Sequence, residues 1–269
     1  MRRGLTCRTN VAGRRLGIDE HSYLRHFPFV TMVVDLDKQT VLHVADDRTT
    51  ESLDVYFAGL SLQARAAIEA IAMDMWEPYR TAVRQHVPDA DAKIVFDRFH
   101  VMRHVTEAMD QVRRKEQRVL KQRGDRRLTG TKLLWLKTRM QSFTADQQCA
   151  FARLRQSTLK STRAWAMKEA LRRLWEFRSI PRARALFACW HTWAIRSCLA
   201  SMRYLAKTLR CYLKNILTYL THRITNAVTE GLNAKIQWIT HSSRSFRDHE
   251  WFKLAIYLHC SGLDLEPRR

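Results

Sequence analysis

Short apolar runs separated by polar turns recur through roughly the first hundred residues of the chain. Runs of this length that are rich in β-branched residues predict strands, and they occur at 16–20, 29–35, 40–45, 68–73 and 92–96. Apolar residues at helical spacing fill two stretches between the later strands, 53–67 and 78–86. Ser61 is placed to cap the second of two short helices in the first stretch, and Pro78 to start the helix in the second. The resulting order, β-β-β-α-β-α-β, predicts an α/β fold in which helices cover the faces of a mixed sheet.

A different pattern follows the last of these strands. Residues 99–219 are rich in Leu, Ala, Arg, Lys and Trp, have almost no strand pattern, and contain Gly or Pro only at Gly124, Gly130 and Pro181. We therefore expect a helical region of roughly 120 residues. Two further helices are expected after it, at 225–239 and 251–259.

The charge of the chain is strongly basic. Lys and Arg number 47 against 26 Asp and Glu, which gives a formal net charge of +21 and a pI near 10.4. Self-repulsion of this size favours a polyanionic partner. A ribosome-associated or membrane-surface protein is the alternative, but a hydrophobic content of 46% with eight Trp is typical of a sizeable core and disfavours it.

Cysteine spacing and targeting signals narrow the class of protein further. The six Cys are scattered without C-x-x-C spacing, so we expect neither a zinc site nor a disulfide framework. The sequence has no signal-peptide pattern and no apolar window of about 18 residues. These observations predict a cytoplasmic protein with no membrane partner.

Acidic residues follow two of the apolar runs at positions that suit chemistry. Asp19 is expected to close the first strand and Asp74 the fourth, and ligands in open α/β sheets gather at the carboxyl ends of strands. Their carboxylates meet only if those two strands are neighbours. Taken alone, each acid is as readily explained as a helix cap or a turn residue. Glu20 should point to the opposite face of the strand from Asp19.

A third acid lies in the penultimate predicted helix. Glu230 comes four residues after Asn226 and three before Asn233, so the three side chains share one helical face. A carboxylate between two amides suits a metal ligand whose orientation is held by its neighbours. Hard carboxylate oxygens are the ligands that Mg²⁺ and Mn²⁺ prefer. Two such ions stabilise the attacking and leaving oxygens of phosphodiester cleavage and strand transfer.

Asp97 and His100 form a further compact signal at a predicted strand-to-helix junction. In one interpretation Asp97 caps the helix while His100 contacts DNA or orients a catalytic group. A helix cap beside a hydrogen-bonded histidine explains the same spacing equally well. The spacing alone therefore leaves both interpretations open.

Basic side chains recur through the helical region and beside the acidic motifs. Arg and Lys neutralise phosphates, and the interleaved Trp rings either stack on unpaired bases or, more often, belong to the core. The residues expected to contact DNA are Arg98, Arg103, Arg113, Arg114, Lys115, Lys235, Arg244 and Arg247. These side chains are better supported as a group than one by one.

Together, four segments resemble the DDE domain of bacterial insertion-sequence transposases of the ISL-three family: 17–20 (Gly-Ile-Asp-Glu), 74–79 (Asp-Met-Trp-Glu-Pro-Tyr), 97–101 (Asp-Arg-Phe-His-Val) and 226–235 (Asn-Ala-Val-Thr-Glu-Gly-Leu-Asn-Ala-Lys). Phe246-Arg-Asp is similar to the Gly-Phe-Arg element of that family, with Ser245 in place of the Gly. The resemblance covers essentially the whole chain in the expected order.

The resemblance implies roles for individual residues. Asp19, Asp74 and Glu230 match the catalytic acids that bind two Mg²⁺ or Mn²⁺ ions, and Asp97 and His100 match a supporting D-x-x-H element. Asp97 is an alternative second catalytic acid, but the strand order favours Asp74 because Asp97 falls on the fifth strand. Asn226 and Asn233 are the other supporting residues.

The resemblance also implies an RNase H-like fold with a large all-helical insertion before the final catalytic helix. We expect an N-terminal remnant, a first part of the core, the insertion and the C-terminal core helices at 1–15, 16–104, 105–222 and 223–269 respectively. The implied partner is DNA, both transposon ends and target, bound by a homo-oligomer in the bacterial nucleoid.

One departure from the family leaves alternatives open. Family members carry a cysteine-rich zinc-binding segment and a helix-turn-helix part before this domain, whereas here residues 1–15 precede the first predicted strand and contain only Cys7. The leading hypothesis is a transposase catalytic domain that cleaves DNA and transfers strands. A truncated DNA-binding remnant and a nuclease of the same fold are the alternatives. The acids at strand ends disfavour a basic helical structural protein.

Overall fold

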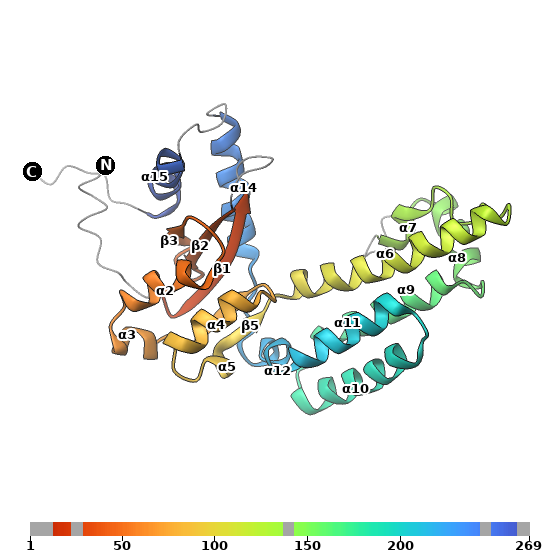
Figure 1. Cartoon of the computed structure of the whole chain (residues 1–269), viewed down its shortest axis with the longest axis horizontal. Helices are drawn as coiled ribbons and strands as arrows, with labels where there is room; N and C mark the ends of the chain where they lie inside the picture. The colour runs from red at the N-terminus through yellow and green to blue at the C-terminus, as the bar shows by residue number, and fades with distance from the viewer. Residues whose placement is uncertain (1–12, 23–28, 137–142, 243–248, 263–269) are drawn as a thin grey trace, which may run out of the picture. The chain divides into compact units, whose positions relative to one another are not determined.

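The computed structural model describes residues 13–22, 29–136, 143–242 and 249–262. The chain forms two compact units (Figure 1). One consists of Met1–Asp97 with Thr221–Arg269, and the other of Arg98–Leu220. Within the described part of the chain, no helix is long and apolar enough to cross a membrane.

The first unit contains a mixed sheet of five strands in the spatial order β3-β2-β1-β4-β5. Its strands are β1 (Arg15–Ser22), β2 (Phe29–Asp35), β3 (Thr40–Ala45), β4 (Ala70–Met73) and β5 (Ile94–Phe96). β2 pairs antiparallel with both β1 and β3, whereas β1, β4 and β5 are parallel to one another. The five predicted strands and the mixed sheet are therefore confirmed.

Strand β1 is longer than its apolar run. Its pairing with β2 continues to Ser22, which lies opposite Phe29, although the residues after Ile18 are polar. Asp19 consequently lies inside β1, and the prediction that it closes the strand is wrong. The hydrogen bonds with β2 extend the strand beyond the point at which hydrophobicity ends.

Helices cover both faces of this sheet, as expected. On one face, α14 (Ala227–Ser242) and α15 (His249–Cys260) pack against alternate residues of β2 and against two valines of β3. The apolar cluster includes Met32, Val34, Ile236 and Phe252. On the other face, α4 (Glu77–His86) follows β4, and its buried Tyr79 shares a hydrogen bond of 2.7 Å with Thr31 of β2. Figure 1 shows α14 and α15 beside the strands.

The connections between strands agree closely with the expected helices. Two short helices, α2 (Thr50–Ala58) and α3 (Leu62–Ala66), cover the stretch expected at 53–67, and α2 begins three residues earlier. The Ser61 hydroxyl accepts the N–H of Ala64 at 3.1 Å as a cap. Pro78 lies in the first turn of α4. The short helix α5 (Ala90–Lys93) was not predicted, and it takes up the first residues of the segment expected to form the fifth strand.

The second unit consists of helices joined by turns, with no strand among its described residues, which confirms the expectation for this region. Its elements are α6 (Arg98–Gln122), α7 (Lys132–Leu136), α8 (Ala145–Arg155), α9 (Lys160–Arg172), η2 (Arg173–Glu176), α10 (Ile180–Arg196), α11 (Ala200–Cys211) and α12 (Leu213–Leu217); α13 (Tyr219–His222) spans the boundary with the first unit. Most of its Trp side chains are core residues, as Trp190 illustrates: its indole N–H donates to the carbonyl of Met167 at 2.9 Å.

A carboxylate from α6 caps the start of α9. No side chain at the N-cap position of α9 accepts a hydrogen bond from the first turn. Glu116 does so instead, because its two oxygens accept the backbone N–H groups of Lys160 and Ser161, both at 2.7 Å. A negative charge at this position also interacts favourably with the helix dipole. This contact joins two helices of the second unit that are far apart in sequence.

Candidate active site

Three aspartates lie at matching positions in or directly after the neighbouring parallel strands of the first unit. β1 and β4 pair in register as far as Gly17 and Ala72, and continuing that register by two residues aligns Asp19 with Asp74. The register of β4 with β5 likewise aligns Asp74 with Asp97, which follows β5 directly. Side chains at matching positions of parallel strands point to the same face. The requirement that the first and fourth strands be neighbours is therefore met.

The Asp19 carboxylate is held from two directions. Its side chain is 6% exposed and lies on the sheet face that α14 covers. One oxygen accepts a hydrogen bond from the Asn233 side-chain amide at 2.9 Å, and the other accepts the backbone N–H of Glu20 at 2.9 Å. Glu20 itself points to the opposite face, as expected, where it pairs with Arg48. The orientation of Asp19 thus depends on α14, which comes more than two hundred residues later in the chain.

Asp97 connects the end of β5 to the start of α14. Its buried carboxylate accepts the backbone N–H of Asn226 at 3.1 Å. Asn226 is itself fully buried, and its amide donates to the carbonyl of Ile18 in β1 at 3.4 Å. Asp97 therefore fixes α14 against the sheet at the end of the helix opposite to Ser242.

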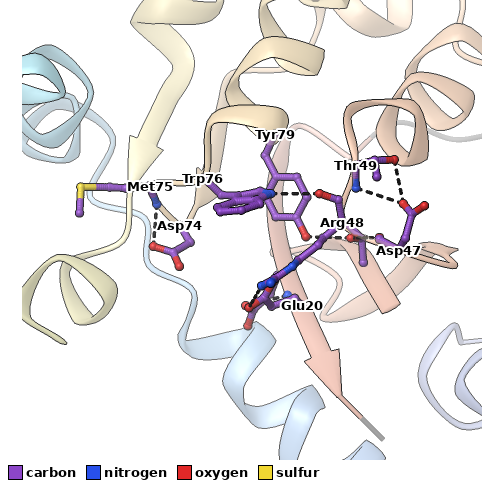
Figure 2. Close-up of polar contacts among 10 residues, drawn as sticks. Glu20, Asp47, Arg48, Thr49, Asp74, Met75, Trp76 and Tyr79 are labelled. Atoms are coloured by element: carbon purple, nitrogen blue, oxygen red, sulfur yellow. Dashed lines mark hydrogen bonds and ion pairs between the residues drawn. The ribbon is translucent and has the colours of Figure 1, made fainter. Parts of the chain in front are cut away.

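Asp74 is half-buried in the turn between β4 and α4 (Figure 2). Its carboxylate accepts the backbone N–H of Met75 at 2.6 Å. The apolar strand β4 is buried along its whole length, so Asp74 is the first residue of this segment that can reach solvent. The prediction that Asp74 directly follows the fourth strand is confirmed.

Glu230 lies on α14 between the two asparagines, but its surroundings differ from theirs. Asn226 and Asn233 both form hydrogen bonds with β1, whereas Glu230 is exposed. Among the residues that the structure describes, no three His, Cys, Asp or Glu side chains are grouped closely enough to hold a metal ion. The structure brings Asp19 and Asp74 to matching positions and places Glu230 one helical turn before Asn233, the residue that binds Asp19.

Strand β1 and helix α14 approach each other very closely at Gly17. A Cβ atom at Gly17 would lie 2.6 Å from the Thr229 hydroxyl oxygen and 3.2 Å from the Asn226 side-chain oxygen. These two oxygens and the side-chain oxygen of Asn233 are buried and lack a hydrogen-bond partner within the described ranges. Buried polar atoms without a partner are rare and often mark functional sites. Sequence reasoning noted both asparagines but missed Gly17 and Thr229.

A second polar cluster, on the other face of the sheet, was also missed. The Arg48 guanidinium binds both carboxylate oxygens of Glu20, at 3.2 and 3.0 Å, and lies over the rings of Phe29 and Trp76, at 4.2 and 5.0 Å from their centroids. The Trp76 indole N–H donates to the backbone carbonyl of Arg48 at 3.0 Å. Figure 2 shows the Trp76 indole between Asp74 and the Arg48–Glu20 pair. The sequence feature that could have indicated this cluster is the position of Trp76, two residues after Asp74.

Buried hydrogen bonds hold the loop that carries Arg48. Thr31 donates to the backbone carbonyl of Asp47 and accepts from the Tyr79 hydroxyl, which lies 2.7 Å away. Burial raises the pKa of the Tyr79 phenol well above its ordinary value of 10.0, so the phenol remains a neutral donor. The loop beside Trp76 is thus anchored directly to β2 through Thr31, which Tyr79 of α4 also binds.

Comparison with known proteins identifies the family. The family model described as transposase, the DDE transposases of the ISL3 type, matches residues 16–256. The chain belongs to the ISL3 (ISL-three) family of DDE transposases. The matched range includes both the acids on the strands and α14.

Two curated relatives of this ISL3-family chain are also transposases by name. The transposase for insertion sequence element IS1001 of Bordetella parapertussis is 29% identical, with 90% of this chain and 59% of the relative covered. The transposase for IS1557 of Mycobacterium tuberculosis is 28% identical, with 87% and 57% covered. The chain therefore spans a little over half the length of these relatives. No solved structure matches it.

The basic residues expected to contact DNA in this ISL3-family chain differ in their accessibility. Arg98, Arg103, Arg114 and Lys115 are exposed on α6. Arg113 is only 4% exposed, because it turns inward to bind Asp110 at 2.7 Å and Gln117 at 2.8 Å. This burial disfavours the expected contact of Arg113 with DNA, and helical periodicity alone does not reveal which cation is buried.

The remaining candidates of the ISL3-family motifs lie elsewhere. Lys235 is exposed on α14, and its ammonium group donates to the backbone carbonyl of His259. His100 is buried in the first turns of α6, within the helical unit. Arg244 and Arg247, with the Phe246 motif, lie outside the described residues.

Proposed function

We propose that the chain is the catalytic part of an insertion-sequence transposase with an RNase H-like fold, which cleaves DNA and transfers its strands in a metal-dependent reaction. The observation that carries this proposal is the alignment of Asp19 and Asp74 on adjacent parallel strands in a chain of this family. The strand order β3-β2-β1-β4-β5 with helices on both faces supports the RNase H-like core. The helical unit Arg98–Leu220 would then be an insertion between β5 and α14.

The acids of the site fit a hard divalent cation. Asp19, Asp74 and Glu230 offer carboxylate oxygens alone, which are the ligands that Mg²⁺ and Mn²⁺ prefer. We assign these three residues to hold the metal. When bound, two such ions would lower the cost of charge on the attacking and leaving oxygens of the phosphodiester.

The residues around the acids would keep them in position. Asn233 holds one oxygen of Asp19, and Asp97 with Asn226 anchors the start of α14. The exposed position of Glu230 leaves its carboxylate accessible to metal and DNA. His100 is the remaining supporting residue, three residues beyond Asp97.

The polyanion implied by a net charge of +21 would be DNA, both transposon ends and target. The basic residues that remain candidates for phosphate contacts are Arg98, Arg103, Arg114, Lys115, Lys235, Arg244 and Arg247. We propose a homo-oligomer as the active form on DNA, in the bacterial cytoplasm at the nucleoid.

The test uses the purified chain with supercoiled plasmid and Mg²⁺ or Mn²⁺. Asp74→Asn and Glu230→Gln should each reduce nicking and joining by at least roughly 100-fold, because each removes one anionic metal ligand. DNA affinity should stay within about twofold, because binding rests on the basic surface. Asp89→Asn is the matched control. It removes the same charge from an exposed residue of the same unit, and Asn tolerates the positive φ of 54° there.

Each outcome bears on the proposal. Cleavage by the wild type and by Asp89→Asn, lost in both site variants, supports it. Cleavage that survives both site substitutions overturns the assignment of the acids. Tight DNA binding with no cleavage by the wild type in either metal overturns the catalytic proposal in favour of a DNA-binding remnant, and nicking without any joined product favours a nuclease.

A further inference from the structure

Trp76 is an exposed aromatic ring beside the aligned acids. It precedes α4 directly, and 39% of its surface is accessible. The other large ring of this segment, Tyr79, is buried at 1% exposure. Within the fold Trp76 supports the loop of Arg48, but more than a third of its surface stays exposed and is available to a partner.

The protein holds the Trp76 ring in one pose. Its N–H, the single polar group of the indole, is bonded to the backbone carbonyl of Arg48. The Arg48 guanidinium lies over the ring and is itself fixed by Glu20 and by the ring of Phe29. With its polar edge bonded and Arg48 lying over the ring, the indole can offer a partner only the part of its π-surface that remains exposed.

We infer that Trp76 is a stacking platform for an unpaired nucleobase next to the scissile phosphodiester. Its Cα lies at most about 7.6 Å from that of Asp74, because two trans peptide units separate them. A base on Trp76 would therefore belong to a nucleotide close to the phosphate at the acids. This inference rests on the proposed function, because it requires DNA to occupy the site that Asp74 marks.

A nucleobase suits this ring better than a protein surface does. In Figure 2 the indole lies among charged groups, with Asp74 on one side and the Arg48–Glu20 pair on the other. The buried centres of protein interfaces are apolar and depleted of charge. Stacking on an aromatic ring is possible for any of the bases and requires one that is not paired within a duplex.

Binding measurements without metal test the inference independently of cleavage. The probes are a short duplex and the same duplex with one unpaired 2-aminopurine, whose fluorescence falls on stacking. The wild type should prefer the unpaired base, and Trp76→Ala should lose roughly 5- to 150-fold of its affinity for that probe alone. Trp76→Phe should retain part of the preference and of the quenching, because a ring remains.

Two further variants keep the result interpretable. Trp76→Leu fills the site but cannot stack, so it replaces the Ala variant if that variant fails to fold. Trp193→Ala is the matched control, because Trp193 lies in the helical unit and is 40% exposed, almost the same as Trp76. The Trp193 variant should behave like the wild type.

The inference fails if Trp76→Leu keeps both the preference for the unpaired base and the quenching, or if Trp193→Ala loses them to the same extent. It also fails if Trp76→Leu changes the oligomeric state while base preference is unaffected, since the ring would then be a protein contact. A wild type that cleaves plasmid although its Trp76 variants bind normally contradicts the stacking role and leaves the proposed function intact. A Trp76-dependent preference in a wild type that does not cleave contradicts the proposed function alone.

Discussion

Replacing Gly17 by Ala tests how closely α14 must approach β1 for the site to form. The added Cβ would lie 2.6 Å from the Thr229 hydroxyl oxygen and 2.9 Å from a methyl carbon of Leu36. The Leu36 methyl ends a side chain that can rotate away. Thr229 is completely buried against the strand, so relief of this contact requires the helix itself to move.

The size of the effect follows from these distances. Ordinary van der Waals contact begins near 3.4 Å, so α14 has to withdraw locally by about 0.8 Å. Overpacking of this kind costs about 1–3 kcal/mol of unfolding free energy. A withdrawal of that size also stretches the 2.9 Å hydrogen bond from Asn233 to Asp19 beyond hydrogen-bond range. We therefore expect DNA cleavage by Gly17→Ala to fall further than its stability loss explains.

The assay is urea unfolding together with amide hydrogen exchange of β1 and α14, which reports on the first unit specifically. Thr229→Ala removes the clashing oxygen, so the double variant should recover part of the loss. The expected coupling energy is at least about 1 kcal/mol. Stability losses of the two substitutions that simply add, or a Gly17→Ala variant as stable as the wild type, would refute this reasoning. In either case the close approach of α14 to β1 does not determine the position of Asp19.

Two further predictions concern pH and helix capping. Burial lowers the pKa of the His21 imidazole, which stacks on Phe252, from its ordinary value of 6.5. Protonation therefore favours the unfolded state: the stability contribution of neutral His21 is present above pH 6.5 and is lost as the pH falls through the folded pKa. In His21→Phe, the urea concentration at the unfolding midpoint should vary less between neutral and mildly acidic pH than in the wild type. An unchanged dependence of the midpoint on pH would show that His21 is not the group responsible. Glu116→Gln should cost about 1–2 kcal/mol and speed hydrogen exchange in the first turn of α9, because one cap acceptor becomes a donor. Glu107→Gln, which weakens only the surface ion pairs with Arg103 and His104, should change stability by less than about 0.5 kcal/mol, and an equal effect of both substitutions would refute the cap.

Local pattern in the sequence was enough to predict most of the elements. Alternating or continuous apolar runs identified all five strands, and helical spacing identified the longer helices of the first unit and the helical character of the second. The error at Asp19 has a clear cause, since β1 is extended by its pairing with β2 and not by its own hydrophobicity. The residue at which a strand ends depends on its pairing with another strand. That partner lies in a different segment of the chain, so the local pattern does not reveal it.

The acids of the candidate site could be singled out from the sequence, but the contacts around them could not. Asp19, Asp74 and Glu230 were singled out by residue type, predicted position and resemblance. The hydrogen bond from Asn233 to Asp19, the buried position of Arg113 and the ring contacts of Arg48 were not foreseen. Each of these contacts depends on the three-dimensional position of a side chain and not on its type.

The sequence by itself determined the fold class, the basic character and the candidate acids, because these follow from hydrophobic period, charge and local motifs. The tertiary structure decided the parallel register that aligns Asp19 with Asp74 and the approach of α14 that holds Asp19. It also decided that Trp76 remains exposed while Tyr79 is buried. Register and burial are set by contacts between segments distant in the chain, so the pattern within any one segment could not specify them.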